Sequence, residues 1–148
     1  MKLSNFDVQK IAKHLEIPNF KGVFTRDQLP KKIGIKETGI VNFNTSKEPG
    51  SHWVAYFQDG SKKIYFDSFG QVIPTKIRKY LKTYRYNLPV IERNTDVVQE
   101  PNTVICGHLC LYVLDNLSKG VNFQDLSIHY GRCIWSRIET RSNRSTRR

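Results

Sequence analysis

The 148-residue sequence contains only three cysteines, and no apolar run approaches the roughly 18 residues that a membrane-spanning helix requires. A small, odd number of cysteines argues against a secreted domain built on disulfides. The N-terminal stretch MKLSNFDVQKIAKHLEI interleaves charges with apolar residues, so it lacks the apolar centre of a signal peptide. These absences predict a protein without a membrane segment, in a reducing intracellular compartment.

Acidic residues are also scarce, because 13 Asp and Glu stand against 24 Lys and Arg, for a formal charge of +11. Part of this charge lies in residues 137–148, which hold five arginines and one glutamate. Such a surplus favours polyanionic partners, although a solvated basic surface that binds nothing has the same composition. With 39% hydrophobic residues and no internal repeat, we expect a single domain over residues 1–136 and a basic, disordered tail at 137–148.

Hydrophobic periodicity predicts a chain of the α+β class. Ser4 is a suitable N-cap for a first amphipathic helix whose apolar side chains include Phe6 and Ile11. A stretch rich in Pro, Gly and charge, residues 18–34, is predicted to be a loop. Helices are predicted at 4–16, 74–84 and 103–120, a short helix within 121–138, and strands at 39–44 and within 86–98.

The clearest local signal is a β-hairpin in SHWVAYFQDGSKKIYFDSFG, where two β-prone runs flank Asp59 and Gly60. If these two residues form the turn, His52 lies directly opposite Asp67, with Cβ atoms roughly 5 Å apart. A carboxylate held against a histidine fixes its tautomer and stabilises the imidazolium. An incidental surface pair remains the alternative, and a longer turn would shift the register.

A second signal is the stretch VVQEPNTVICGHLC, which places Cys106 in the first turns of a helix capped by Asn102 or Thr103. Unpaired backbone N–H groups at a helix N-terminus favour the thiolate over the thiol, and a neighbouring imidazolium lowers the pKa further. The alternative is that Cys106 and Cys110 are ordinary buried thiols, four residues apart on one helical face.

Two neighbours of Cys106 extend this interpretation. Gly107 has no side chain, so we expect it to let a substrate backbone approach the sulfur. Gln99, on the turn that leads into the helix, is a candidate donor to a developing oxyanion, beside the N–H of Cys106. A solvated loop position for Gln99 is the alternative.

Taken in order, GSHWVAYF, YFDSFG and VQEPNTVICGHLCLYVL resemble the His-Trp, acidic and Gln-to-Cys motifs of the adenovirus-type cysteine endopeptidases. The SUMO-deconjugating proteases are wider relatives with the same order of His, Asp, Gln and Cys. The sequence pattern QEPN…CG..C is more similar to that of the adenoviral branch and of the proteases of Polinton-type mobile elements. The resemblance covers roughly residues 20–117 and implies a papain-like, adenain-like core, with a mixed β-sheet flanked by helices and the nucleophile at a helix N-terminus.

The resemblance also implies roles for four residues. It assigns Cys106 as the nucleophile and His52 as the general base and then acid. Asp67 orients the histidine, at a position where adenoviral members often have Glu, and Gln99 lines the oxyanion hole. The implied activity is a thiol endopeptidase that cleaves at Gly-containing sites.

The implied biological role is the maturation of capsid or core precursors of a virus or virus-like element. Such an enzyme is expected to act as a monomer on polypeptides, in the nucleus or cytoplasm of a host or in the virion. One alternative is a deconjugating protease for SUMO or ubiquitin-like modifiers. Another is a nucleic-acid-binding protein on an inactive protease scaffold.

The helix at 74–84 is predicted to carry a basic face. Its members lie largely off the apolar stripe and are Lys76, Arg78, Lys79, Lys82 and Arg85. They are candidates for phosphate contacts, together with the Arg-rich tail, or for a solvated face. Since adenoviral relatives use DNA as a cofactor, the resemblance implies DNA as a candidate activator and no other required cofactor. A peptide bound covalently through a cysteine is not expected, because the corresponding position falls near Leu88.

The CGHLC motif does not predict a metal site. On a helix His108 points away from Cys106, and the sequence has no second ligand pair at the proper spacing for zinc.

Overall fold

The computed structural model describes residues 3–43, 52–60, 62–84, 91–98 and 106–126. Its centre is a mixed five-stranded sheet in the order β1-β2-β3-β4-β5. The strands are β1 (Phe20–Thr25), β2 (Lys36–Asn42), β3 (Trp53–Asp59), β4 (Lys62–Phe66) and β5 (Glu92–Arg93). The helices are α1 (Asn5–His14), α2 (Thr75–Leu81) and α3 (Cys106–Ser118), followed by a 3-10 turn at Phe123–Asp125. The predicted α+β class is confirmed.

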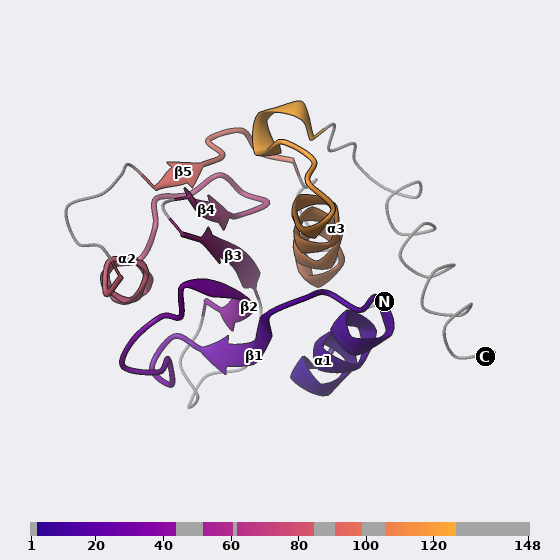
Figure 1. The fold of residues 1–148 in the computed structure, drawn as a ribbon, viewed down its shortest axis with the longest axis horizontal. Coiled ribbons are helices and arrows are strands. Elements are labelled where there is room, and N and C mark those ends of the chain that lie inside the picture. The colour runs from indigo at the N-terminus through magenta and orange to yellow at the C-terminus, as the bar shows by residue number, and fades with distance from the viewer. Residues whose placement is uncertain (1–2, 44–51, 61, 85–90, 99–105, 127–148) are drawn as a thin grey trace.

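Helices cover both faces of the sheet (Figure 1). The first and last strand pairs are parallel, and the two central pairs are antiparallel. One face packs against α1 and α3 through a cluster that includes Trp53 and Phe66, and the other packs against α2 through Tyr56 and Tyr65. Among the described ranges, no helix combines the length and the apolar character that a membrane span requires.

The β3–β4 hairpin is confirmed, but its predicted register is wrong by two residues. Asp59 pairs with Lys62, so Gly60, with φ of 58°, is the first of the two turn residues and not the second. Side chains alternate between the faces of a strand with a period of two, so an even shift leaves each residue on its predicted face. His52 and Asp67 are therefore diagonal neighbours across the hairpin, which longer side chains can still bridge.

The predicted loop over residues 18–34 is wrong in its first part, because Phe20–Thr25 form β1. The strand pairs in parallel with β2, and its register shifts between Phe20 and Val23. An irregular strand at the edge of a sheet accommodates glycine and charged residues that a central strand would exclude. The composition of residues 18–34 therefore resembles that of a loop, although the first part forms the edge strand β1.

Helix α1 begins where the sequence predicts. Ser4 and Asp7 form a reciprocal capping box, in which the Ser4 side chain accepts from the Asp7 N–H and the Asp7 carboxylate accepts from the Ser4 N–H. The buried side chains of the helix are Val8 and Ala12, whereas Phe6 is 73% exposed. Phe6 therefore lies outside the packed face, which consists of Val8 and Ala12 with the partly buried Ile11 and Leu15.

A buried carboxylate ties the sheet to α2. Glu37 Oε2 accepts hydrogen bonds from Tyr56 Oη at 2.6 Å and Tyr80 Oη at 2.5 Å, and Oε1 accepts from the Gly34 N–H at 3.0 Å. Burial raises the pKa of both tyrosines, so their hydroxyls remain donors over the ordinary pH range. Three donors compensate the loss of water around the carboxylate.

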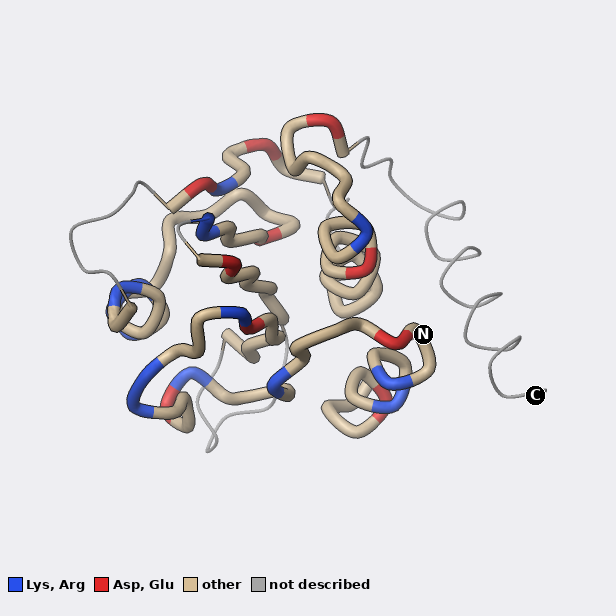
Figure 2. The backbone as a smooth tube through the Cα atoms, viewed as in Figure 1, with Lys and Arg blue, Asp and Glu red and all other residues tan. Residues whose placement is uncertain are grey.

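Helix α2 is anchored at its C-terminal end by Lys63, which is almost fully buried. The Lys63 ammonium donates to the backbone carbonyls of Leu81 and Tyr84, where a helix otherwise leaves acceptors unpaired. Burial, and then the charge of Lys82, lowers the pKa of Lys63. Basic residues mark the outer side of this helix (Figure 2).

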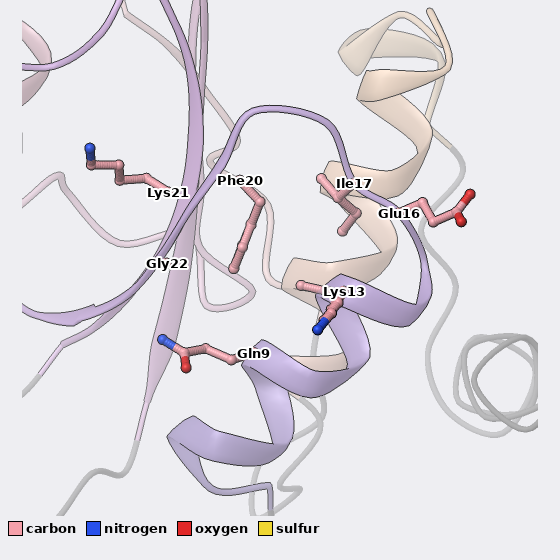
Figure 3. Close-up of a pocket in the computed structure, with 8 residues that line it drawn as sticks. Gln9, Lys13, Glu16, Ile17, Phe20, Lys21 and Gly22 are labelled. Carbon is pink, nitrogen blue, oxygen red and sulfur yellow. The ribbon is translucent and has the colours of Figure 1, made fainter. Parts of the chain in front are cut away.

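A cavity of about 510 Å³ lies between α1 and β1 (Figure 3). Its floor is apolar, with Ala12, Ile17 and Phe20, and Gln9 and Lys13 belong to its polar rim. The described residues of the predicted catalytic set do not line it. The cavity is thus separate from the site described below.

Gly39 permits Tyr56 to lie across the sheet and reach Glu37, since a Cβ at position 39 would lie 2.5 Å from Tyr56 Oη. We predict that Gly39→Ala lowers the free energy of unfolding by about 1–3 kcal/mol, as overpacking does in well-packed cores. Chemical denaturation measures this change. Gly34→Ala is the matched control, because its Cβ would meet Glu37 Oε1 at an ordinary 3.4 Å, and equal losses in both variants would contradict the packing argument.

Candidate active site

The ends of β3 and β4 bring a histidine and a carboxylate together. His52 Nε2 lies 2.7 Å from Asp67 Oδ1, so the diagonal register still permits the predicted contact. The Asp67 side chain is fully buried and that of His52 is 12% exposed. The backbone carbonyl of His52 also accepts from the Phe43 N–H at 2.7 Å, which continues the β2–β3 pairing and holds the histidine in place.

Two aromatic rings flank the His52 imidazole. The ring centroid of Phe69 lies 4.9 Å from that of His52, and the centroid of Phe43 lies 5.7 Å away. The Phe69 N–H donates to Asp67 Oδ1 at 2.8 Å, so the same residue contacts the histidine and its carboxylate. The sequence analysis did not predict that either phenylalanine contacts His52, although Phe69 belongs to the same YFDSFG motif as Asp67.

Cys106 completes the group from the first residue of α3. It is 4% exposed, and it lies close enough to His52 for the two side chains to shift each other's pKa. Since Nε2 of the histidine is engaged by Asp67, Nδ1 is the nitrogen available to the sulfur. Nδ1 is buried and makes no hydrogen bond within the described residues. The structure therefore places Cys106 beside His52, whose other ring nitrogen contacts Asp67.

The environment of the sulfur favours its ionised form. Burial is the largest single influence and opposes the charge, but the interactions with His52 and with nearby backbone groups together outweigh it and lower the pKa of Cys106 below that of an ordinary thiol. Backbone hydrogen bonds from Trp53 and Gly107 add to this effect. The start of a 13-residue helix contributes a further favourable field for a negative charge.

The pKa of His52 shifts in the opposite direction to that of Cys106. Burial opposes its charge, but the hydrogen bonds and charges of Asp67 and Cys106 raise the pKa of His52 to about 9. Because the thiol pKa is lowered and the imidazole pKa is raised, these shifts favour a thiolate–imidazolium pair of Cys106 and His52. This is the protonation state that a thiol nucleophile requires.

The expected role of Gly107 is wrong. A Cβ at this position would lie 2.9 Å from Cε3 of Trp53, so the missing side chain makes room for the indole ring and not for a substrate. Trp53 also donates from Nε1 to Asn5 Oδ1 at 3.0 Å, and its carbonyl accepts from the Cys110 thiol at 3.3 Å. Gly107 thus fixes the packing of β3 against the start of α3.

The other polar residues of α3 are not arranged for a metal. Cys110 is fully buried, and burial raises the pKa of its thiol well above the ordinary value. His108 is also buried, and burial lowers its pKa to about 3, so it is neutral at physiological pH. Among the described residues, no group of three or more His, Cys, Asp or Glu could hold a metal ion.

Several predicted positions lie outside the described residues. They are Gln99, the capping candidates Asn102 and Thr103, Arg85, the position near Leu88, and the tail at 137–148. The four remaining basic residues of the α2 region, Lys76, Arg78, Lys79 and Lys82, are exposed, as predicted for that face. The structure brings together three of the four predicted catalytic residues, and their catalytic roles stay predictions.

Comparison with solved structures identifies the fold. The chain is similar to a crystal structure of the ASFV (African swine fever virus) pS273R protease, with a TM-score of 0.64, 14% sequence identity, and coverage of 95% of this chain and 66% of that one. A selenomethionine form of the same protease gives a TM-score of 0.62 at 16% identity, with the same coverage. The chain shares the fold of this protease.

The chain spans 66% of the length of those structures, so they contain regions without a counterpart here. No protein-family model and no curated protein matches the sequence. At this level of identity the similarity concerns the architecture. It supports the fold that the sequence motifs imply, whereas activity and specificity are matters for experiment.

The ion pair predicts a particular pH dependence for alkylation of Cys106. Because its thiol pKa is lowered, iodoacetamide should react rapidly below pH 8, and the rate should fall only when the pH drops below the lowered value. We predict that His52→Ala moves this midpoint to or above about 8.5, the ordinary thiol value. Mass mapping of the labelled peptide measures the rate at Cys106, with Cys106→Ser as the control. An unchanged midpoint in His52→Ala would contradict the pairing.

Proposed function

We propose that this protein is a cysteine endopeptidase. The observation that carries the proposal is the 2.7 Å contact of the buried Asp67 with His52, beside a Cys106 that begins a helix and has a lowered thiol pKa. This arrangement supplies a nucleophile, a proton carrier and a group that orients the carrier. The similarity of the fold to a protease supports the same conclusion.

The proposed reaction has two stages. The Cys106 thiolate attacks the peptide carbonyl carbon, and the electron pair of the carbonyl moves to oxygen to form a tetrahedral oxyanion. When the C–N bond breaks, the His52 imidazolium gives its proton to the leaving amine, and an acyl-enzyme remains. His52 then removes a proton from a water molecule that attacks the thioester, and the acid is released with the thiol restored as the ion pair. The predicted donor to the oxyanion, besides backbone N–H groups, is Gln99.

The substrates that we propose are polypeptides with glycine near the cleaved bond, from precursor proteins of a virus or virus-like element. The resemblance of the motifs to adenovirus-type endopeptidases supports this substrate class, and a similar structure belongs to a viral protease. The two phenylalanines beside His52 narrow the space around the base, which favours residues with small side chains next to the reacting bond. The alternative function is the removal of SUMO-like or ubiquitin-like modifiers, in which the same thiol chemistry acts on a different class of protein substrate.

We predict that the protein cleaves peptides containing Gly-Gly-X and that Cys106→Ala abolishes the cleavage. Asp67→Asn should lower kcat/KM by about 100-fold, because it weakens the stabilisation of the imidazolium. Cleavage is followed by mass spectrometry. Cys110→Ala is the matched control on the same helix and should retain activity. Full activity in Cys106→Ala would end the proposal, and reaction only with SUMO or ubiquitin carrying a C-terminal electrophile would favour the deconjugase.

A second proposal concerns nucleic acid as a partner. The α2 region carries exposed Lys76, Arg78, Lys79 and Lys82, and the sequence of the helix contains no acidic residue. The loop before β2 lies against the end of this helix, because the Ile33 N–H donates to Thr83 Oγ1 at 2.9 Å. This contact brings the exposed Lys31 and Lys32 near the same region. A dense positive surface of this kind suits a phosphate backbone, and DNA is the activator that the resemblance implies.

We predict salt-sensitive binding of double-stranded DNA that depends on α2. Replacing Lys76, Arg78, Lys79 and Lys82 by Ala should reduce the slope of log K against log salt by about 0.9 for each phosphate that the variant no longer neutralises. Fluorescence anisotropy at several salt concentrations measures the slope. The control changes the same number of charges elsewhere, at Lys10, Lys13, Lys21 and Lys119. An equal effect in both variants would show attraction by net charge without a defined surface.

A further inference from the structure

Asp67 lies one residue beyond the end of β4, which ends at Phe66. The pairing between β4 and β5 consists of Ile64 with Glu92 and Tyr65 with Arg93, so the strand ladder does not reach Asp67. Beyond the ladder, the backbone hydrogen bond to Asp67 is the turn contact in which its carbonyl accepts from the Gly70 N–H at 2.8 Å. The carboxylate nevertheless has to lie within 2.7 Å of His52 to make the observed contact.

The side chain of Asn94 takes the place of the missing strand pairing. Its Oδ1 accepts from the Asp67 N–H at 3.0 Å, and its Nδ2 donates to the Asp67 carbonyl at 2.5 Å. Nδ2 also donates to the Asp96 carbonyl at 3.2 Å, which fixes the orientation of the amide. A single side chain therefore satisfies both backbone groups of Asp67, as a neighbouring strand would.

Further contacts join the same two segments. The Val98 N–H donates to the Ser68 carbonyl at 2.8 Å. At Gly70, which has φ of 62°, a Cβ would lie 2.5 Å from the Thr95 carbonyl oxygen, so only glycine allows this approach. The turn that begins at Asp67 thus packs directly on residues 94–98, with Asn94 at the point of contact with the carboxylate-bearing residue.

We propose that Asn94 is a positioning residue, which holds the backbone of Asp67 so that its carboxylate meets His52 and thereby maintains the ion pair with Cys106. Asn94 does not touch the reacting atoms, and it acts through Asp67 alone. The inference rests on the proposed function for its catalytic meaning, but its effect on the thiolate can be measured without a substrate.

The test is the pH profile of Cys106 alkylation by iodoacetamide in the full-length protein. Asn94→Ala should raise the midpoint by about one pH unit, which is about a tenfold loss of thiolate at pH values below the midpoint. Arg93→Ala is the matched control, since Arg93 is the preceding residue and donates to the Gln71 carbonyl without contacting the Asp67 backbone. Near-UV circular dichroism checks that each variant is folded. If Asn94→Ala does not fold, Asn94→Leu, whose side chain has a similar volume to that of Asn, is used in its place.

A double-mutant cycle separates positioning from general destabilisation. If Asn94 acts through Asp67, then Asn94→Ala has little further effect on the midpoint in an Asp67→Asn background. A profile unchanged in the folded Asn94 variants, or a shift of equal size in that background, would overturn the inference. A wild-type protein that shows the predicted alkylation profile but cleaves no peptide would instead refute the proposed function, so the two failures are distinguishable.

Discussion

The removal of one carboxylate from water determines the properties of this site. Asp67 is fully buried, and its Oδ1 accepts from His52 Nε2 and from the Phe69 N–H. A buried negative charge makes a positive charge on the adjacent imidazole favourable, and that imidazolium in turn favours a negative sulfur on Cys106. Burial opposes each charge when it is considered alone. The three charges are therefore stable only as a set, and each depends on the geometry of the other two.

The fold supplies this geometry from three separate elements, and Trp53 connects them. Its backbone contacts the sulfurs of Cys106 and Cys110, and its indole fills the space that Gly107 leaves open. The register of β3 is thus coupled directly to the position of α3. On the opposite face of the sheet, the hydrogen bonds to Glu37 couple the same strand to α2.

The sequence predicted the grouping of His52, Asp67 and Cys106 because their signals are local or depend on the alternation of a strand. The faces of the β3–β4 hairpin were correct even though the turn was displaced, since an even shift preserves the alternation. Asn94 could not be predicted in the same way, because it acts on the backbone of a residue distant in sequence and leaves no periodic pattern. Phe43 contacts the histidine only through the tertiary pairing of β2 with β3. The edge strand β1 was missed because packing on α1 overrides its weak propensity.

A lowered thiol pKa also makes Cys106 more vulnerable to peroxides, because the thiolate is the form that they oxidise. Cys110 is poorly suited to rescue it through an internal disulfide. Positions four apart on a helix have Cβ atoms about 5–6 Å apart, beyond the roughly 3.5–4.5 Å that a disulfide requires, and burial keeps this second thiol protonated. Within the described residues, Cys110 therefore gives Cys106 no partner for an internal disulfide.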